Sequence, residues 1–200
     1  MNTLFLKIVF MIFWVSVSVI RYPHGKRQRK NKIKENRKTP EEKILLFGAT
    51  LGMGLMPVIY VFTPFLNFAD YSLPIWVNIL GLLLAGPSLW LFYRSHKDLG
   101  LNWSASLEVR EEHTLVTDGI YQSIRHPMYT SIWLWVLVQA FLLPNLVAGW
   151  AGFVTFGILY VLRVGKEEKM MLQQFGGQYQ DYMQKTGRLI PRMGKEKQVH

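Results

Sequence analysis

The residues best suited to chemistry gather in one polar stretch, Ser95 to Tyr129, and in a short charged segment further along the chain. The stretch ends in Arg125-His126-Pro127-Met128-Tyr129 and separates two apolar runs. A loop that only joined two membrane helices could be far shorter. Arg163 and Glu167 follow four residues apart, a spacing that places both on one face of a helix. An arginine of this kind could bind an anion, and an inward-facing carboxylate could bind an amine or a ribose hydroxyl.

Each feature also has a purely structural interpretation. Arg163 and Glu167 could form an interfacial salt bridge whose arginine extends toward water. Pro127 is a normal first residue of a helix, and Arg125 and His126 before it could simply lie at a membrane surface.

Several other chemistries are excluded by the sequence. The chain has no cysteine, so it has neither disulfides nor thiolate nucleophiles. No glycine-rich dinucleotide motif, Walker loop or Gly-x-Ser-x-Gly elbow is present. His113 and His126 match no helical pair of metal ligands, so we expect no metal.

Composition indicates which elements must position these residues. Half of the 200 residues are hydrophobic, yet the net charge is +10. Apolar and basic residues are segregated into blocks, which favours an integral membrane protein over a soluble, nucleic-acid-binding one. We therefore expect an all-α fold without a nucleic-acid partner, organised as a single domain over residues 1–200. Its five transmembrane helices are expected at about 3–20, 44–65, 75–92, 130–143 and 146–162.

The distribution of Lys and Arg predicts the orientation of the chain. The strongly basic segment from Arg21 to Lys43 is expected in the cytoplasm, with the amino terminus outside. Counting crossings then places the polar stretch and the carboxy terminus in the cytoplasm. Pro144-Asn145 predicts a tight turn between two antiparallel helices. Apolar residues between Met170 and Met183 recur at helical spacing, which predicts a carboxy-terminal amphipathic helix on the membrane surface, or two short ones.

Four ordered motifs resemble the isoprenylcysteine carboxyl methyltransferase family. The resemblance extends over residues 94–192, and its arginine, histidine and glutamate elements are shared with phospholipid methyltransferases. A short chain of five spans resembles the prokaryotic members, and Ser106 stands where eukaryotic members have a glutamine. The motifs are His113 to Tyr121, Arg125 to Tyr129, Arg163-x-x-x-Glu167-Glu168 and Thr186 to Pro191.

The resemblance implies an S-adenosylmethionine site formed by the polar stretch and the last two spans. Arg163 would face the methyl acceptor, a lipid-like molecule that enters from the bilayer among membrane lipids. His126 would be the base if the acceptor were a protonated amine. The residues implied in cofactor binding are His113, Thr114, Leu115, Val116, Tyr121, His126, Pro127, Met128, Tyr129 and Glu167.

Four functions remain open from the sequence. Carboxyl methylation of a prenylated cysteine or a similar small lipid-linked thiol acid is favoured, because an arginine beside the acceptor suits an anion. Phospholipid N-methylation is the alternative. A nicotinamide-dependent membrane reductase and a non-catalytic membrane scaffold are further possibilities.

Overall fold

The structure is a computed structural model of the 200-residue chain and describes residues 2–28, 33–36, 39–100, 108–110 and 114–192. The predictions made for His113 and Ser106 therefore lie outside the described residues. Two short strands, β1 (Ile33–Asn36) and β2 (Glu108–Arg110), pair antiparallel. The helices are α1 (Thr3–Gln28), α2 (Pro40–Thr50), α3 (Met56–Phe62), α4 (Ile75–Leu99), α5 (Pro127–Leu142), α6 (Ala151–Phe175) and α7 (Gly177–Lys185).

The helical class predicted from the sequence is confirmed, with the strand pair as an addition. Strands of four and three residues are too short for a period-two pattern to be visible in the sequence. Within the described residues, three helical stretches are long and apolar enough to cross a membrane, namely Thr3–Gly25, Pro40–Phe62 and Ile75–Leu99. The chain is thus a helical membrane protein, while the count of five spans stays a prediction.

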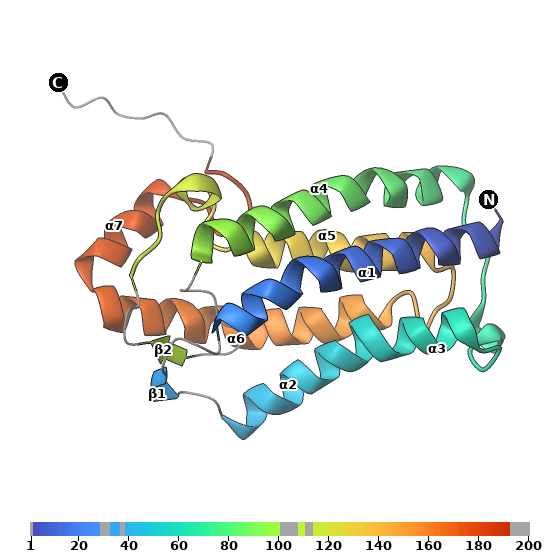
Figure 1. Cartoon of the computed structure of the whole chain (residues 1–200), viewed down its shortest axis with the longest axis horizontal. Helices are drawn as coiled ribbons and strands as arrows, with labels where there is room; N and C mark the ends of the chain where they lie inside the picture. The colour runs from blue at the N-terminus through green and yellow to red at the C-terminus, as the bar shows by residue number, and fades with distance from the viewer. Residues whose placement is uncertain (1, 29–32, 37–38, 101–107, 111–113, 193–200) are drawn as a thin grey trace.

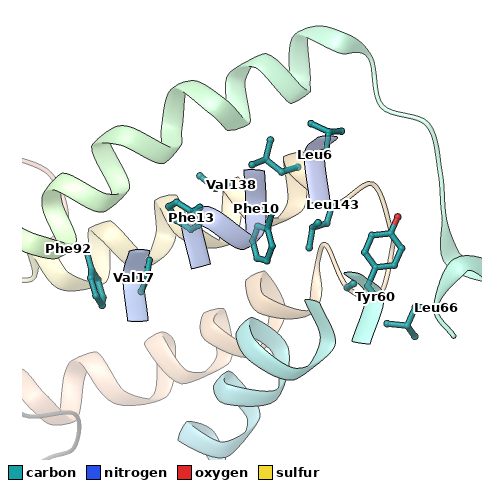
Figure 2. Close-up of a cluster of buried hydrophobic side chains, with 11 residues drawn as sticks. Leu6, Phe10, Phe13, Val17, Tyr60, Leu66, Phe92, Val138 and Leu143 are labelled. Atoms are coloured by element: carbon teal, nitrogen blue, oxygen red, sulfur yellow. The ribbon is translucent and has the colours of Figure 1, made fainter. Parts of the chain in front are cut away.

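One face of α1 forms the centre of the larger hydrophobic core. Leu6, Phe10, Phe13 and Val17 recur every three or four residues, and none is more than 3% exposed. Figure 2 shows these side chains between the neighbouring helices, where they meet Phe92 and other buried residues. The other faces of α1 carry exposed apolar side chains, as expected of a helix in contact with lipid: Leu4, Phe5, Ile8, Ile12, Val15 and Val19.

The predicted hairpin is present, with a longer turn than expected. Helices α5 and α6 lie antiparallel (Figure 1), but α6 begins at Ala151 rather than at Leu146. Asn145 explains the difference, because it is fully buried and organises the turn. Its amide nitrogen donates to the carbonyl of Leu66 at 2.6 Å, and its oxygen accepts from the Ala148 amide at 2.8 Å. These bonds satisfy backbone groups that a buried turn would otherwise leave unpaired.

A π-helical stretch, Leu51–Leu55, joins α2 to α3 and contacts α6. Gln139 of α5 donates a hydrogen bond of 2.9 Å to the carbonyl of Gly52 within it. A Cβ atom at Gly52 would lie 2.6 Å from the Ala151 carbonyl oxygen, so only glycine permits this approach. Small residues allow helices to approach closely in a membrane, and Gly52 serves this purpose, whereas a Cβ atom at Gly48 or Gly54 would meet open space.

Helix α6 continues well beyond the predicted end of the span at residue 162 and reaches Phe175. Arg163, Glu167 and Glu168 therefore belong to one uninterrupted helix. Gly176 ends it with a φ of +52°, and α7 follows directly.

Segments far apart in the sequence meet at the same end of the helical bundle. Helix α7, the strand pair and the loop before α5 lie at one end, and the amino terminus and the connector from α3 to α4 lie at the other (Figure 1). This partition agrees with the alternation of sides predicted from charge. Which end faces the cytoplasm stays a prediction.

Candidate functional site

The loop that precedes α5 is anchored on the end of α4. Gly119 has a φ of +61°, and the next amide, that of Ile120, donates to Asp98 Oδ2 at 2.9 Å. A Cβ atom at Gly119 would lie 2.3 Å from the same carboxylate oxygen. Glycine is thus required both by the backbone conformation and by the close approach. Asp98 is held in turn by Arg94 at 3.2 Å.

This anchored loop places Tyr121 in contact with α7. Tyr121 is 6% exposed, and its carbonyl accepts a 2.6 Å hydrogen bond from the hydroxyl of Tyr182. Burial raises the pKa of Tyr182 well above its ordinary range, so the phenol remains a donor. The amphipathic segment of the sequence therefore turns buried tyrosines toward the loop.

The carboxy-terminal segment after α7 ties down the start of α5. The amides of Arg125 and His126 donate to the carbonyls of Gly187 and Arg188 at 2.8 and 3.0 Å. The Thr130 hydroxyl donates to the carbonyl of Leu189 at 2.6 Å. The backbone of the motif at residues 186–191 thus holds the start of α5 and fixes the position of the His126 main chain.

Glu168 is the centre of a buried ionic cluster. It is 5% exposed, and its Oε1 lies 3.3 Å from Arg125 Nε, 3.3 Å from His126 Nε2 and 3.1 Å from Arg188 Nε. Burial raises the pKa of Glu168, but hydrogen bonds with His126 and Arg188 outweigh it and lower the pKa from 4.5 to about 2. Glu168 is therefore ionised at neutral pH.

Glu167 has different surroundings, since its side chain is 27% exposed. Its Oε2 accepts a 2.6 Å hydrogen bond from the Tyr129 hydroxyl and lies 3.9 Å from Arg163 Nε. Its Oε1 lies 3.9 Å from His126 Nδ1. His126 is thus flanked by both carboxylates, one at each ring nitrogen.

A cavity of about 480 Å³ adjoins these groups. Its volume is in the range of small-molecule and cofactor sites. Pro127 is buried in the first turn of α5 and is not among the residues that line it, and His113 lies outside the described residues. The predicted site residues that do line it are Thr114, Leu115, Val116, Tyr121, His126, Met128, Tyr129, Arg163 and Glu167.

The same cavity continues between apolar helices. On α6, Phe156, Leu159, Arg163 and Glu167 recur every three or four residues and all line it, so one helix face passes from apolar to charged. Arg163 lies at that boundary. The apolar wall, for which the sequence offered no signal, also includes Trp14, Val17, Leu46, Ala49, Met53, Ile132 and Trp135.

Comparison with known proteins gives this arrangement a family. The model of the isoprenylcysteine carboxyl methyltransferase (ICMT) family matches residues 71–173, just over half of the chain. The chain belongs to the ICMT family. The matched segment contains the polar stretch, α5 and most of α6.

Curated relatives agree with the ICMT assignment. A protein-S-isoprenylcysteine O-methyltransferase of Dictyostelium discoideum is 36% identical over 88 residues, which are 42% of this chain and 35% of that protein. A protein of the same name in Schizosaccharomyces pombe is 35% identical over 40% of this chain and 34% of its own length. The human protein of that name is 27% identical over 58% of this chain and 42% of its own. The chain thus spans about a third to under half of these relatives.

A solved ICMT structure resembles the fold over a larger part of the chain. It is described as the eukaryotic intramembrane Ras methyltransferase ICMT, and it is 27% identical. The superposition has a TM-score of 0.50 and covers 79% of this chain and 54% of that one. The ICMT resemblance seen in the sequence motifs is therefore confirmed at the level of family and fold.

The residues present fit the polar cofactor that the ICMT family implies. The cavity offers a carboxylate at Glu167 for an ammonium or hydroxyl group, and Tyr179 and Met171 for an aromatic ring. Four residues near the site fall within the sequence patterns, but the sequence did not indicate that they belong to the site: Glu168, Arg188, Tyr179 and Tyr182. Two signals could have found them, the pair of adjacent glutamates and the tyrosines spaced three apart on one helix face.

Proposed function

We propose that this protein transfers a methyl group from S-adenosylmethionine to the carboxylate of a prenylated cysteine or a similar small lipid-linked thiol acid. The observation that carries the proposal is the single cavity in which a charged end continues into an apolar one, with Arg163 at the boundary. S-adenosylmethionine would supply an electrophilic methyl group on a sulfonium. An acceptor that is both anionic and lipid-like suits the two ends of this cavity.

In the proposed site, each residue has a limited task. Glu167, oriented by Tyr129, would hold the polar end of the cofactor together with residues 113–116, Tyr121 and residues 126–129. Arg163 would bind the acceptor carboxylate through charge-assisted hydrogen bonds. That carboxylate is ionised at neutral pH, so no base is required. The remaining tasks of the site are to align the two reactants and to exclude water. Positioning alone can lower the activation barrier by roughly 7–11 kcal/mol.

We also propose a topology for the protein. Residues 1–200 would form one membrane domain that crosses five times, with α5 and the apolar part of α6 as the last two spans. The amino terminus would lie outside, and the end of the bundle that carries α7 would lie in the cytoplasm. The acceptor would enter from the bilayer, and the cofactor from the cytoplasm.

Phospholipid N-methylation is a second candidate, favoured by the surroundings of His126. Glu168 Oε1 lies 3.3 Å from His126 Nε2. The other ring nitrogen, Nδ1, lies on the side of Glu167 and would be the one to accept a proton. A protonated amine acceptor would need such a base, whereas a carboxylate would not.

A labelling experiment separates the two functions. The purified protein is incubated with methyl-labelled S-adenosylmethionine and either S-farnesylcysteine or phosphatidylethanolamine. We expect label in the farnesylcysteine product, released by mild base because methyl esters are base-labile. Base-stable label in the phospholipid would support N-methylation instead, and no transfer to either acceptor would contradict both proposals.

A further inference from the structure

Glu42 belongs to the first turn of α2, yet its carboxylate is buried beside Arg163. Its side chain is 6% exposed, and 3.7 Å separates its Oε1 from Arg163 Nη2. Thr39 caps the helix, since its hydroxyl oxygen accepts from the Glu42 amide at 3.2 Å. The cap fixes the first turn and with it the direction in which Glu42 leaves α2. A buried carboxylate is tolerated when it is paired with a cation, so the contact with Arg163 stabilises the Glu42 side chain in its buried position.

The preceding residue provides a natural contrast. Glu41 pairs with Lys166 at 2.6 Å, but both side chains of this pair are about half exposed. Exposed pairs are screened by water and salt and contribute little. Helices α2 and α6 are thus linked by two neighbouring ion pairs, of which only the Glu42–Arg163 pair contains a residue that lines the larger cavity.

Arg163 is held by carboxylates from two helices. Glu42 of α2 approaches Nη2, and Glu167 of α6 approaches Nε at 3.9 Å. These contacts are ion pairs rather than hydrogen bonds, and because the guanidinium is planar and rigid, attraction at two of its nitrogens restricts its orientation. Arg163 also lines a second, smaller cavity of about 190 Å³ between α2 and α6, where Lys166 and Lys169 are found. Its side chain therefore forms part of the wall between the two cavities.

We propose that Glu42 is a positioning residue, which holds the Arg163 guanidinium from the side of the smaller cavity, so that the guanidinium stays at the wall of the larger one where the acceptor carboxylate would bind. The inference rests on the proposed role of Arg163 in acceptor binding. Residue 42 lies outside the segment 71–173 that the family model matches. The amino-terminal part of the chain thereby contributes to the binding of the acceptor, in addition to its packing role.

The test compares Glu42→Gln with the matched control Glu41→Gln in the full-length protein. Glu42→Gln keeps the size of the side chain and removes its charge, so we expect the KM for S-farnesylcysteine to rise about tenfold. The affinity for S-adenosylhomocysteine, measured by calorimetry on the same preparations, is expected to stay unchanged. Glu41→Gln is expected to change neither quantity. A merely structural role would lower the thermal stability of Glu42→Gln without this selective rise in KM.

A double-mutant cycle shows whether Glu42 acts through Arg163. In an Arg163→Lys background, Glu42→Gln is expected to add no further loss, because the group it positions has already been changed. An unchanged KM in Glu42→Gln alongside an active wild type would overturn the positioning role. A lowered KM would overturn it as well, since it would mean that Glu42 competes with the acceptor for Arg163.

Failure of the proposed function is distinguishable from failure of this inference. A wild type that methylates no acceptor overturns the proposed function alone. The thermal shift produced by S-farnesylcysteine in the wild type and in Glu42→Gln then tests the positioning role by itself. A smaller shift in the variant supports it, and equal shifts overturn it.

Discussion

Glu167 and Glu168 are adjacent in the sequence but have different surroundings in the fold. Glu168 is buried beside the guanidinium groups of Arg125 and Arg188, whereas Glu167 is partly exposed to the cavity and bonded to Tyr129. One helix rotates consecutive side chains by about 100°, so neighbours on α6 point to different sides. The two glutamates therefore differ in role: Glu168 fixes the loop before α5 and the carboxy-terminal segment at residues 186–192, here called the strap, whereas Glu167 faces the cavity.

Removing the Tyr129 hydroxyl tests the ligand-facing role at this scale. In Tyr129→Phe, Glu167 loses its 2.6 Å hydrogen bond. A hydrogen bond to a charged group contributes about 1.5–3 kcal/mol, so the affinity for S-adenosylhomocysteine is expected to fall about tenfold or more. Isothermal titration calorimetry measures the loss.

The matched control for this substitution is Tyr93→Phe. Tyr93 is 45% exposed and is not among the residues that line the cavity, so its variant is expected to bind like the wild type. Equal affinities in the wild type and in Tyr129→Phe would show that Glu167 does not contact the cofactor in the proposed way.

At the scale of elements, the carboxy-terminal segment is attached to α5 and α6 through Glu168. The backbone of residues 187–189 bonds to the start of α5, and Arg188 bonds to the Glu168 carboxylate. This attachment is what brings the end of the chain back to the polar loop. Since it depends on an ionised carboxylate, it is expected to depend on pH.

The pH dependence has a definite sign. The pKa of Glu168 is lowered in the folded protein to about 2, from 4.5. Its stabilising contribution, on the order of 1–3 kcal/mol, is fully present above pH 4.5 and is lost as the pH falls toward 2. The midpoint of thermal unfolding in detergent, measured between about pH 6 and pH 3, is expected to fall in the wild type as the pH is lowered. In Glu168→Gln, which cannot titrate, the fall over the same range is expected to be smaller.

A carboxylate elsewhere at the same end of the molecule serves as the control. Asp181 is exposed on α7, and Asp181→Asn is expected to follow the wild type throughout the titration. If Glu168→Gln and the wild type lost stability in parallel, the ionic cluster would not be what couples the strap to pH.

At the scale of the whole molecule, the bundle separates two kinds of chemistry along its length. The amino terminus and two connectors lie at one end, and the site's loop, α7 and the strap lie at the other (Figure 1). The cavity reaches from that polar end into the apolar interior. A membrane protein with this polarity can admit a water-soluble cofactor and a lipid-like acceptor to one site from different phases.

The proposed orientation can be tested directly, because the chain contains no cysteine. Ser72, in the connector from α3 to α4, and Gln178, in α7, are exposed, and these two elements lie at opposite ends of the bundle (Figure 1). In intact cells, a membrane-impermeant maleimide is expected to label Ser72→Cys. It is expected to label Gln178→Cys only after the membrane is permeabilised. The reverse pattern would mean that the site lies outside.

Much of the site was predictable from local sequence alone. Three of the five apolar runs coincide with helical stretches long and apolar enough to cross a membrane. The spacing of Arg163 and Glu167 placed them on one helix face, which the uninterrupted α6 confirms. The motifs indicated the ICMT family, which the family match confirms. Helix ends were less accurate, because a turn organised by a buried side chain such as Asn145 depends on partners 75 and 79 residues away.

The sequence by itself determined the membrane character, the helical class and the residues that bear charge near the site. Only the tertiary structure decided which of them meet. That Glu168 faces Arg125 and Arg188, and that Glu42 reaches Arg163, follows from the packing of α2 and the carboxy-terminal strap against α5 and α6. The physical reason is that helical periodicity is a local property, whereas burial and ion pairing depend on contacts between distant segments.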